Sequence, residues 1–365
     1  MENKQKVLVM GGSEFMGRRF VLDLLPNENY SVYIVNRGKI YWNTDMKKIP
    51  EVHFFYGDRN TYLEFQKLLA YISDKAGITP EKRWDMVVDF SCYERKQMKC
   101  AIRGLKNLCK LYVYISTDSV YDVCDRKIRR EDFIREEYAV RPESDALIEE
   151  LNEQDEYGND KLRCEEYLRS HEHELGFPYI NLRLPDVIGP YDSSGRFWAY
   201  LIWLKNNKEH PIHLNKNFEI RSLSFVFSHD VSRILLHILD RIKNYPDAAN
   251  WLAKINGESY NLAFEEKISL KVLIEKLAAF IGIEKVNFID EKKLIKAGKF
   301  FYPSVECGPL NISKVKSQLG FVPTKLDDAL RETYNFFDKG NDTYFAEFKK
   351  AHEKFLKAIA IGKAE

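Results

Sequence analysis

The sequence lacks several features that would assign it to a specialised class of protein. It has almost no net charge, because 56 Lys and Arg residues nearly balance 55 Asp and Glu residues and leave +1 at pH 7. Such a balance gives no general attraction to nucleic acid or to a membrane surface. Neither a secretory signal core nor a membrane-length apolar run is present. We therefore expect a cytoplasmic protein with no membrane or nucleic-acid partner.

The six cysteines lack the spacing of a metal site or a disulfide framework. No Cys-x-x-Cys pair occurs, and scattered cysteines in a chain of 365 residues indicate reduced thiols. His171 and His173 lie two positions apart, which on a helix turns their rings in different directions. We predict that the protein has no metal site.

What the first half contains is a regular alternation of apolar, β-rich runs and helical stretches. Strands are expected at 6–10, 30–35, 52–56, 85–90, 111–116 and 179–184, with helices at 15–25, 61–76, 95–110 and 159–173. This alternation predicts a parallel sheet with helices on both faces, and right-handed crossovers make it doubly wound. The predicted fold class is therefore α/β, a Rossmann sheet.

Beyond Pro190 the alternation loosens, which predicts a smaller C-terminal lobe at the carboxyl edge of the sheet. We expect a dinucleotide-binding domain over 1–190, a substrate lobe over 191–335 and a helical extension over 336–365. Part of the chain at about 222–262 is expected to return to the first domain. Residues 191–225 read as loop-rich, and an amphipathic helix is expected from Asp342 onward.

Residues 7–17, VLVMGGSEFMG, form an apolar run that breaks at a glycine pair and continues as a helix. Glycines let the backbone approach a dinucleotide pyrophosphate, and the free N–H groups of the first helical turn face that anion. An ordinary glycine turn is the alternative interpretation. The cofactor contacts predicted in this segment are Gly11, Gly12, Ser13, Phe15, Met16 and Gly17.

Charged residues follow the second and third expected strands. Asn36 and Arg37 stand where an acid would hold the ribose of NAD, whereas an arginine suits the 2′-phosphate of NADP. A solvated arginine on a turn is the alternative. Asp58, followed by Arg59, could accept a hydrogen bond from adenine or cap the next helix. We predict NADP(H) in preference to NAD(H), with further contacts from Phe90, Ser91 and Pro185.

The fifth expected strand ends in hydroxyls at Ser116 and Thr117, and Tyr157 and Lys161 share one helix face further along the chain. A free phenol has a pKa of about 10. A neighbouring ammonium favours the phenolate and moves the pKa toward neutrality, as general acid–base catalysis requires. A Tyr-x-x-x-Lys spacing also occurs by chance. Its place after the Ser-Thr strand end favours Thr117, Tyr157 and Lys161 as catalytic residues, the last two also contacting the cofactor.

Together, the segments GGSEFMG, STDSVYD, YGNDK and RLPDVIGP resemble the extended short-chain dehydrogenase/reductase superfamily, in its NAD(P)-dependent epimerase/dehydratase family, over residues 5–336. The resemblance implies a Rossmann fold and a catalytic Thr117, Tyr157 and Lys161. It implies epimerase or reductase chemistry on a hydroxyl or keto carbon, as in a nucleotide-activated sugar. The glycine segment also resembles a subgroup with bacterial epimerase-like and chloroplast stem-loop-binding proteins. An RNA-binding or regulatory protein that retains the fold and cofactor site is therefore the alternative.

Two departures from the family pattern bear on function. Glu14 stands at the middle glycine of G-x-x-G-x-x-G, where a carboxylate beside the pyrophosphate is unfavourable unless it turns to solvent. Ser119 follows Thr117 and Asp118 where sugar dehydratases carry a second acid, which argues against 4,6-dehydration. The acidic stretch between Tyr121 and Tyr157 is expected to form a mobile insertion near the site.

Substrate and subunit contacts are the least specific predictions. Substrate contacts are expected from Thr117, Asp118, Ser119, Arg196 and Arg221. The two arginines are candidate anion ligands, with ordinary surface residues as the alternative. Met98, Ile102 and Leu105 form a helix stripe that fits either a homodimer interface or packing onto the sheet.

Overall fold

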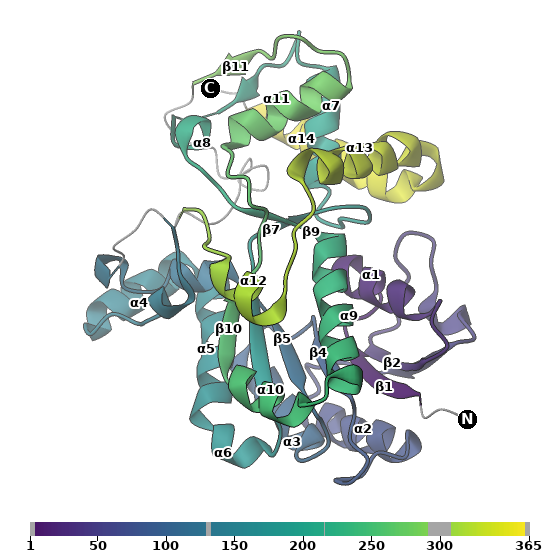
Figure 1. Ribbon diagram of the computed structural model, residues 1–365. Coiled ribbons are helices and arrows are strands. Elements are labelled where there is room, and N and C mark those ends of the chain that lie inside the picture. The colour runs from purple at the N-terminus through teal and green to yellow at the C-terminus, as the bar shows by residue number, and fades with distance from the viewer. Residues whose placement is uncertain (1–3, 129–132, 215, 291–307, 362–365) are drawn as a thin grey trace.

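The computed structural model describes residues 4–128, 133–214, 216–290 and 308–361 (Figure 1). Its centre is a seven-stranded sheet in the order β10-β6-β5-β4-β1-β2-β3, and every neighbouring pair is parallel. The strands are β1 (Gln5–Met10), β2 (Tyr30–Asn36), β3 (Val52–Tyr56), β4 (Met86–Asp89), β5 (Tyr112–Thr117), β6 (Tyr179–Leu184) and β10 (Glu258–Asn261). This arrangement confirms the predicted doubly wound α/β fold.

Helices cover both faces of the sheet because successive residues of a buried strand point to opposite sides. In β1, Val7 and Val9 pack with α1 and α9, which lie side by side in Figure 1. Leu8 and Met10 pack on the other face with α2, α3 and α5. The helices of this half are α1 (Phe15–Leu24), α2 (Tyr62–Lys75), α3 (Arg95–Leu105), α4 (Asp145–Gln154), α5 (Glu156–Ser170), α6 (Glu172–Leu175), α9 (Ser228–Asn244), α10 (Ala248–Ile255) and α12 (Ser313–Leu319).

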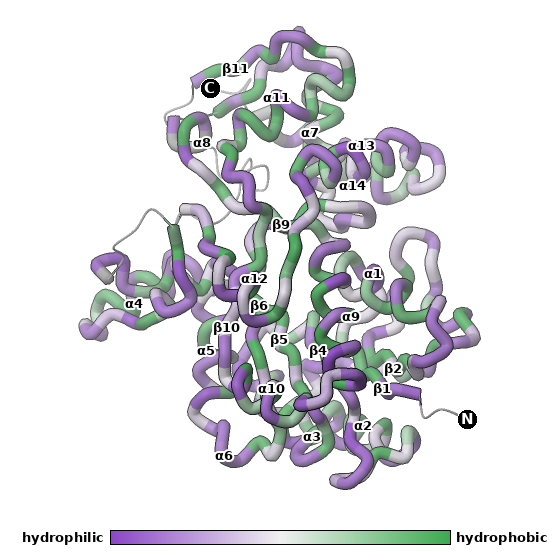
Figure 2. Tube along the Cα trace, in the orientation of Figure 1, coloured by the Kyte–Doolittle hydropathy of each residue, from purple (hydrophilic) through white to green (hydrophobic). Residues whose placement is uncertain are grey.

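A second group of elements has its own apolar core above the carboxyl edge of the sheet (Figures 1 and 2). It contains α7 (Arg196–Lys205), α8 (Lys216–Ile220), α11 (Leu270–Phe280), α13 (Leu326–Thr343), α14 (Phe345–Ile361) and the paired strands β8 (Ile212–His213) and β11 (Phe288–Ile289). At the junction, β7 (Asp186–Ile188) pairs with β9 (Phe225–Phe227). The division into domains at residues 190 and 335 stays a prediction.

Residues 191–225 contain a helix that the sequence did not reveal. Eight of the ten residues of α7 are buried. A helix that is apolar on all sides has no 3.6-residue alternation, so its pattern resembles that of a buried loop or strand. The C-terminal helix predicted from Asp342 onward is confirmed as α14, which begins at Phe345, and a separate helix, α13, ends just before it at Thr343.

The acidic segment between Tyr121 and Tyr157 lies partly outside the described residues, at 129–132, and includes the unpredicted helix α4. Its described part is tied to β10, the edge strand of the sheet. The side-chain amide of Asn261 donates to the carbonyl of Ile134 over 3.0 Å, and the backbone N–H of Asn261 donates to the carboxylate of Glu136 over 2.9 Å. The segment therefore packs against the sheet edge rather than over the site predicted from Thr117.

The helix stripe of Met98, Ile102 and Leu105 is buried within the chain, with exposed fractions of 6% or less. Packing onto the sheet therefore accounts for it, and a homodimer stays a prediction. The cysteines at 92, 100, 109, 124 and 164 are buried free thiols, while Cys307 lies outside the described residues. None of the helices in the described ranges has the length and apolar character needed to cross a membrane.

Candidate active-site crevice

Two adjoining cavities lie along the carboxyl edge of the sheet, where the strand order reverses between β1 and β4. Parallel α/β sheets bind ligands at such a switch point. The glycine-loop cavity has a volume of about 380 Å³, and residues after β1, β2, β3 and β4 line it. The tyrosine cavity has a volume of about 390 Å³ and lies against the ends of β5 and β6. The two form one crevice because they share Phe15, Met16, Phe90, Tyr93 and Ser193.

The glycine segment forms a tight turn whose packing leaves no room for larger residues. A Cβ on Gly17 would collide with the carbonyl oxygen of Gly11, and one on Gly11 would lie 2.9 Å from the Cβ of Ser91. Gly12 packs underneath the turn, against Val21, rather than lining the cavity. Gly11, Gly17, Phe15 and Met16 do line it, as predicted from the sequence.

The first turn of α1 faces this cavity without a side-chain cap. Its N-cap residue, Glu14, makes no capping hydrogen bond, so the first N–H groups of the helix have no side-chain acceptor from that residue. Phe15 has a φ of 42°, a left-handed conformation that costs a residue with a side chain about 1–3 kcal/mol. An unsatisfied helix N-terminus beside a strained turn is suited to holding an anionic group.

The end of β2 supplies the next part of the cavity wall. The side-chain amide of Asn36 donates to the hydroxyl of Ser13, and its oxygen accepts from the backbone N–H of Gly38 over 2.9 Å. These bonds fix the turn that carries Arg37, whose side chain is exposed and lines the cavity together with Lys39. Two cations are thus available at this end of the crevice.

The turn after β3 excludes one of the two interpretations of Asp58, and a contact with adenine stays a prediction. Its carboxylate accepts from the backbone N–H of Asn60 over 3.0 Å, whereas α2 begins at Tyr62 with Thr61 as its N-cap residue. Asp58 therefore stabilises a turn and lines the cavity, but it does not cap the helix.

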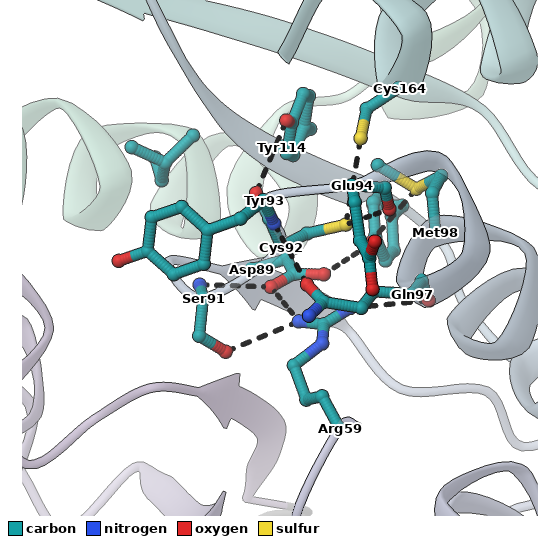
Figure 3. Close-up of polar contacts among 12 residues, drawn as sticks. Arg59, Asp89, Ser91, Cys92, Tyr93, Glu94, Gln97, Met98, Tyr114 and Cys164 are labelled. Carbon is teal, nitrogen blue, oxygen red and sulfur yellow. Dashed lines mark hydrogen bonds and ion pairs between the residues drawn. The ribbon is translucent and has the colours of Figure 1, made fainter. Parts of the chain in front are cut away.

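Arg59 is committed to a buried ion pair beneath the cavity (Figure 3). Its guanidinium contacts the carboxylate of Asp89, which is fully buried, and donates to the hydroxyl of Ser91 over 3.2 Å. Asp89 also accepts from the phenol of Tyr112 over 2.5 Å and from the backbone N–H of Ser91 over 3.1 Å. Arg59 therefore orders the loop after β4, and although it lines the cavity, its charge is already paired.

Sequence reasoning missed Asp89. An acid at the end of an otherwise apolar strand was the available signal, but only the fold shows that Arg59 reaches it across 30 residues. The pKa of Arg59 is raised: burial, the largest single effect, lowers it, but the charges of Asp89, Cys92 and Tyr112 and the hydrogen bond with Asp89 together outweigh burial.

Thr117, Tyr157 and Lys161 all line the tyrosine cavity, although they come from β5 and α5. Tyr157 is 47% exposed because its ring opens onto the crevice. Partial burial raises the pKa of its phenol, the neighbouring Tyr93 adds to the rise, and a side-chain hydrogen bond with Thr117 opposes it. The expectation that the ammonium of Lys161 lowers the pKa of Tyr157 is therefore wrong.

The reason lies in the orientation of Lys161. Its ammonium donates to the backbone carbonyls of Ile115 over 2.6 Å and Cys92 over 2.9 Å, and only 2% of the residue is exposed. Burial lowers the pKa of this amine. In Figure 3, Cys92 lies in the loop that Asp89 and Arg59 hold, and its carbonyl also accepts from Tyr114. The lysine is thus positioned by the loop after β4 rather than by the phenol.

Three carboxyl groups also line the tyrosine cavity: Asp118, Asp186 and Asp192. Burial raises the pKa of Asp118 well above its usual range, and the charges of Asp186 and Asp122 add to that effect. Asp186 is paired with Arg196 over 2.5 Å, so Arg196, a predicted substrate residue, reaches the cavity with its charge already paired. Asp192 accepts from Ser194 through both the backbone N–H and the hydroxyl, each over 2.8 Å.

Most of the other predicted substrate and cofactor residues line one of the two cavities, and one of them lies outside both. Ser119 and Pro185 line the tyrosine cavity, while Ser13, Asn36 and Ser91 line the glycine-loop cavity. Arg221 lies directly after α8 and is not among the described residues that line either cavity. Asp186 and Asp192 were not predicted, because the start of β7 and the loop before α7 reach the site only through the tertiary fold.

Solved structures with a similar fold cover nearly the whole chain. A dTDP-glucose 4,6-dehydratase from Bacillus anthracis, in complex with NAD, is 16% identical, with 94% of this chain and 99% of that chain covered and a TM-score of 0.66. A UDP-glucuronic acid 4-epimerase from Bacillus cereus, in complex with NAD, is 19% identical, with 92% and 99% covered and a TM-score of 0.63. A UDP-N-acetylglucosamine 4-epimerase from Methanobrevibacter ruminantium is 17% identical, with 92% and 99% covered and a TM-score of 0.65.

The family model described as the NAD dependent epimerase/dehydratase family matches residues 7–263, which is more than half of the chain. A comparison with curated proteins found no match. The matched residues include the glycine turn and the segments that carry Thr117, Tyr157 and Lys161. The resemblance seen in the sequence motifs is confirmed at the level of the family: the chain belongs to the NAD dependent epimerase/dehydratase family.

Proposed function

We propose that the protein is an NAD(P)-dependent oxidoreductase or epimerase that acts on a hydroxyl or keto carbon held in the tyrosine cavity. The observation that supports this most is the convergence of Thr117, Tyr157 and Lys161 in a cavity continuous with the glycine-loop cavity. One crevice can then hold a dinucleotide along its length and the reacting carbon at its far end.

The described residues fit a dinucleotide at the glycine-loop end. The turn at Gly11 and Gly17 is packed too tightly for larger residues and brings its backbone to the cavity wall, and the N-terminus of α1 lacks a side-chain cap. A bound nicotinamide would supply the acceptor or donor of a hydride. Arg37 and Lys39 support NADP(H) over NAD(H), because two exposed cations beside the end of β2 can pair with a 2′-phosphate. The subgroup predicted from the glycine segment stays a prediction.

The chain's own catalytic task is to move a proton at the substrate oxygen. Because burial raises the pKa of Tyr157, the phenol is neutral near pH 7 and is set to donate its proton when a ketone is reduced. Thr117 lines the same cavity as that phenol, where it can orient the substrate oxygen. Lys161, fixed by two carbonyls, lines the same cavity and is available to a bound cofactor.

Nucleotide-activated sugars are the first substrate class to test, since the structural relatives are named for them. Arg196 is the described arginine of the tyrosine cavity, and it would have to loosen its pair with Asp186 to hold a diphosphate. The position of Ser119 after Asp118 continues to argue against 4,6-dehydration.

The test is the Tyr157→Phe variant with Tyr71→Phe, an exposed residue of α2, as the matched control. Each protein is given NADP⁺ or NAD⁺ and a panel of UDP-glucose, UDP-glucuronic acid and dTDP-glucose. We measure nicotinamide fluorescence and the sugar products. Tyr157→Phe should lose turnover by about 100-fold or more while NADPH still binds, and the control should match the wild type.

Undiminished turnover in Tyr157→Phe would contradict the proposal. Absence of turnover in the wild type, together with RNA binding that the Tyr157→Phe change leaves intact, would instead support the non-catalytic alternative.

A further inference from the structure

We propose that Glu14 weakens the hold on the dinucleotide so that the cofactor enters and leaves in each reaction cycle, which makes the protein a net oxidoreductase rather than an epimerase. The inference rests on the proposed function, because it concerns how the same crevice handles its cofactor. It distinguishes two reactions that the catalytic residues alone leave open.

Glu14 is placed where a pyrophosphate would lie. It is the last residue before α1, has an extended backbone with φ −131° and ψ 144°, and lines the glycine-loop cavity. Its side chain makes no hydrogen bond to the helix N-terminus. The family pattern has a glycine at this position, and a glycine brings neither charge nor bulk to the cavity.

The carboxylate acts on other residues that line the same cavity. Its charge contributes to the raised pKa of Tyr41, which lines the cavity with Glu14. Burial is the larger cause of the raised pKa of Tyr41, and Glu14 adds to it, as it also does for Tyr93. Since Tyr41 and Tyr93 both line this cavity, the negative charge of Glu14 acts within the space where the dinucleotide would bind.

The arginines near Glu14 do not simply neutralise its charge, because each has another partner or role. Arg59 is already paired with Asp89 beneath the cavity. Arg37 opposes the effect of Glu14 on Tyr41 and Tyr93, but it is also the residue proposed to receive the 2′-phosphate. A dinucleotide must therefore be bound against a like charge, which weakens its affinity.

The strength of binding separates two reaction types. An epimerase returns the hydride to the carbon from which it came, so the cofactor ends each cycle unchanged and has no need to leave. A net reduction moves a hydride from the cofactor to the substrate carbon and a proton from Tyr157 to the oxygen, and the oxidised cofactor must then be replaced. Weak cofactor binding, caused by the charge of Glu14, therefore favours a net reduction over an epimerisation.

The experiment compares wild type with Glu14→Gln, which removes the charge, and Glu14→Gly, which restores the family residue. Glu51→Gln, on the exposed turn before β3, is the matched control. Affinities for NADPH and for adenosine are measured by calorimetry at low and high salt. Glu14→Gln should bind NADPH about tenfold more tightly than wild type, with the difference shrinking at high salt and with adenosine binding unchanged.

Equal NADPH affinity in wild type and Glu14→Gln would overturn the inference, and so would wild-type protein that keeps a full complement of cofactor through extensive dialysis. Either result leaves the proposed function standing. If neither wild type nor Glu14→Gln binds NADPH, the proposed function itself fails. Thermal unfolding of each variant confirms that the comparison is made between folded proteins.

Discussion

The two cavities of the crevice differ in how the chain builds them. The glycine-loop cavity is made from short segments directly after β1 to β4, and its outer wall carries the exposed side chains of Arg37 and Lys39. The tyrosine cavity draws on β5, α5 and the distant loop at 185–197, and two of its three carboxyl groups are buried. One end thus suits a phosphate-bearing ligand, and the other suits a ligand rich in hydroxyl groups.

Ligand binding in the first cavity and proton transfer in the second therefore depend on different structural features. Binding at the first cavity depends on backbone shape, which glycines and a helix N-terminus provide locally. Proton transfer at the second depends on placing Lys161 and Tyr157 correctly, and Lys161 is held by a carbonyl of the loop that Arg59 and Asp89 order. The Arg59–Asp89 pair beneath the first cavity therefore also helps to position Lys161 in the second.

We expect the largest effect from removing the Arg59–Asp89 ion pair. Arg59→Met leaves Asp89 buried without its cation, which should lower the free energy of unfolding by about 3–5 kcal/mol. Denaturant unfolding measures the loss, and the double variant with Asp89→Asn should recover most of it because no unpaired charge remains. A single variant as stable as wild type would show that the pair does not support the loop.

A smaller effect is expected at the outer wall of the glycine-loop cavity. Arg37→Ala should weaken NADPH binding by about tenfold and change NADH binding little, because only NADPH carries the 2′-phosphate. Calorimetric titration of both cofactors measures the ratio, with exposed Lys67→Ala on α2 as the control. Equal losses for NADPH and NADH would remove the basis for the NADP(H) preference.

The smallest effect concerns Asp118 in the tyrosine cavity. Its folded-state pKa is raised above the value of about 3.9 in an unfolded chain, so its contribution to stability is present below that pH and is lost as pH rises toward the folded pKa. Asp118→Asn cannot ionise, and its melting temperature should exceed that of wild type by about 2 °C near pH 7.

Near pH 4 the two melting temperatures should converge, because the carboxyl of Asp118 is then largely protonated in wild type as well. The same difference at every pH would show that packing, and not ionisation, distinguishes the two proteins.

Local patterns predicted the glycine turn of the first cavity and the catalytic candidates of the second, but not how the second cavity is assembled. The glycine turn, the strands and the positions of Thr117, Tyr157 and Lys161 follow from short-range periodicity and spacing. The orientation of Lys161 does not, because a carbonyl of β5 and one of the loop after β4 determine it. Asp192 also escaped prediction, since tertiary packing of the loop before α7 alone brings it to the crevice.

The claim that the two cavities form one working crevice is tested most directly by a crystal structure of the protein with NADPH. We expect the adenosine phosphates beside Arg37 and the glycine turn, with the nicotinamide ring reaching the tyrosine cavity next to Thr117 and Tyr157. A dinucleotide bound elsewhere, or one whose nicotinamide ring lies away from Tyr157, would contradict it.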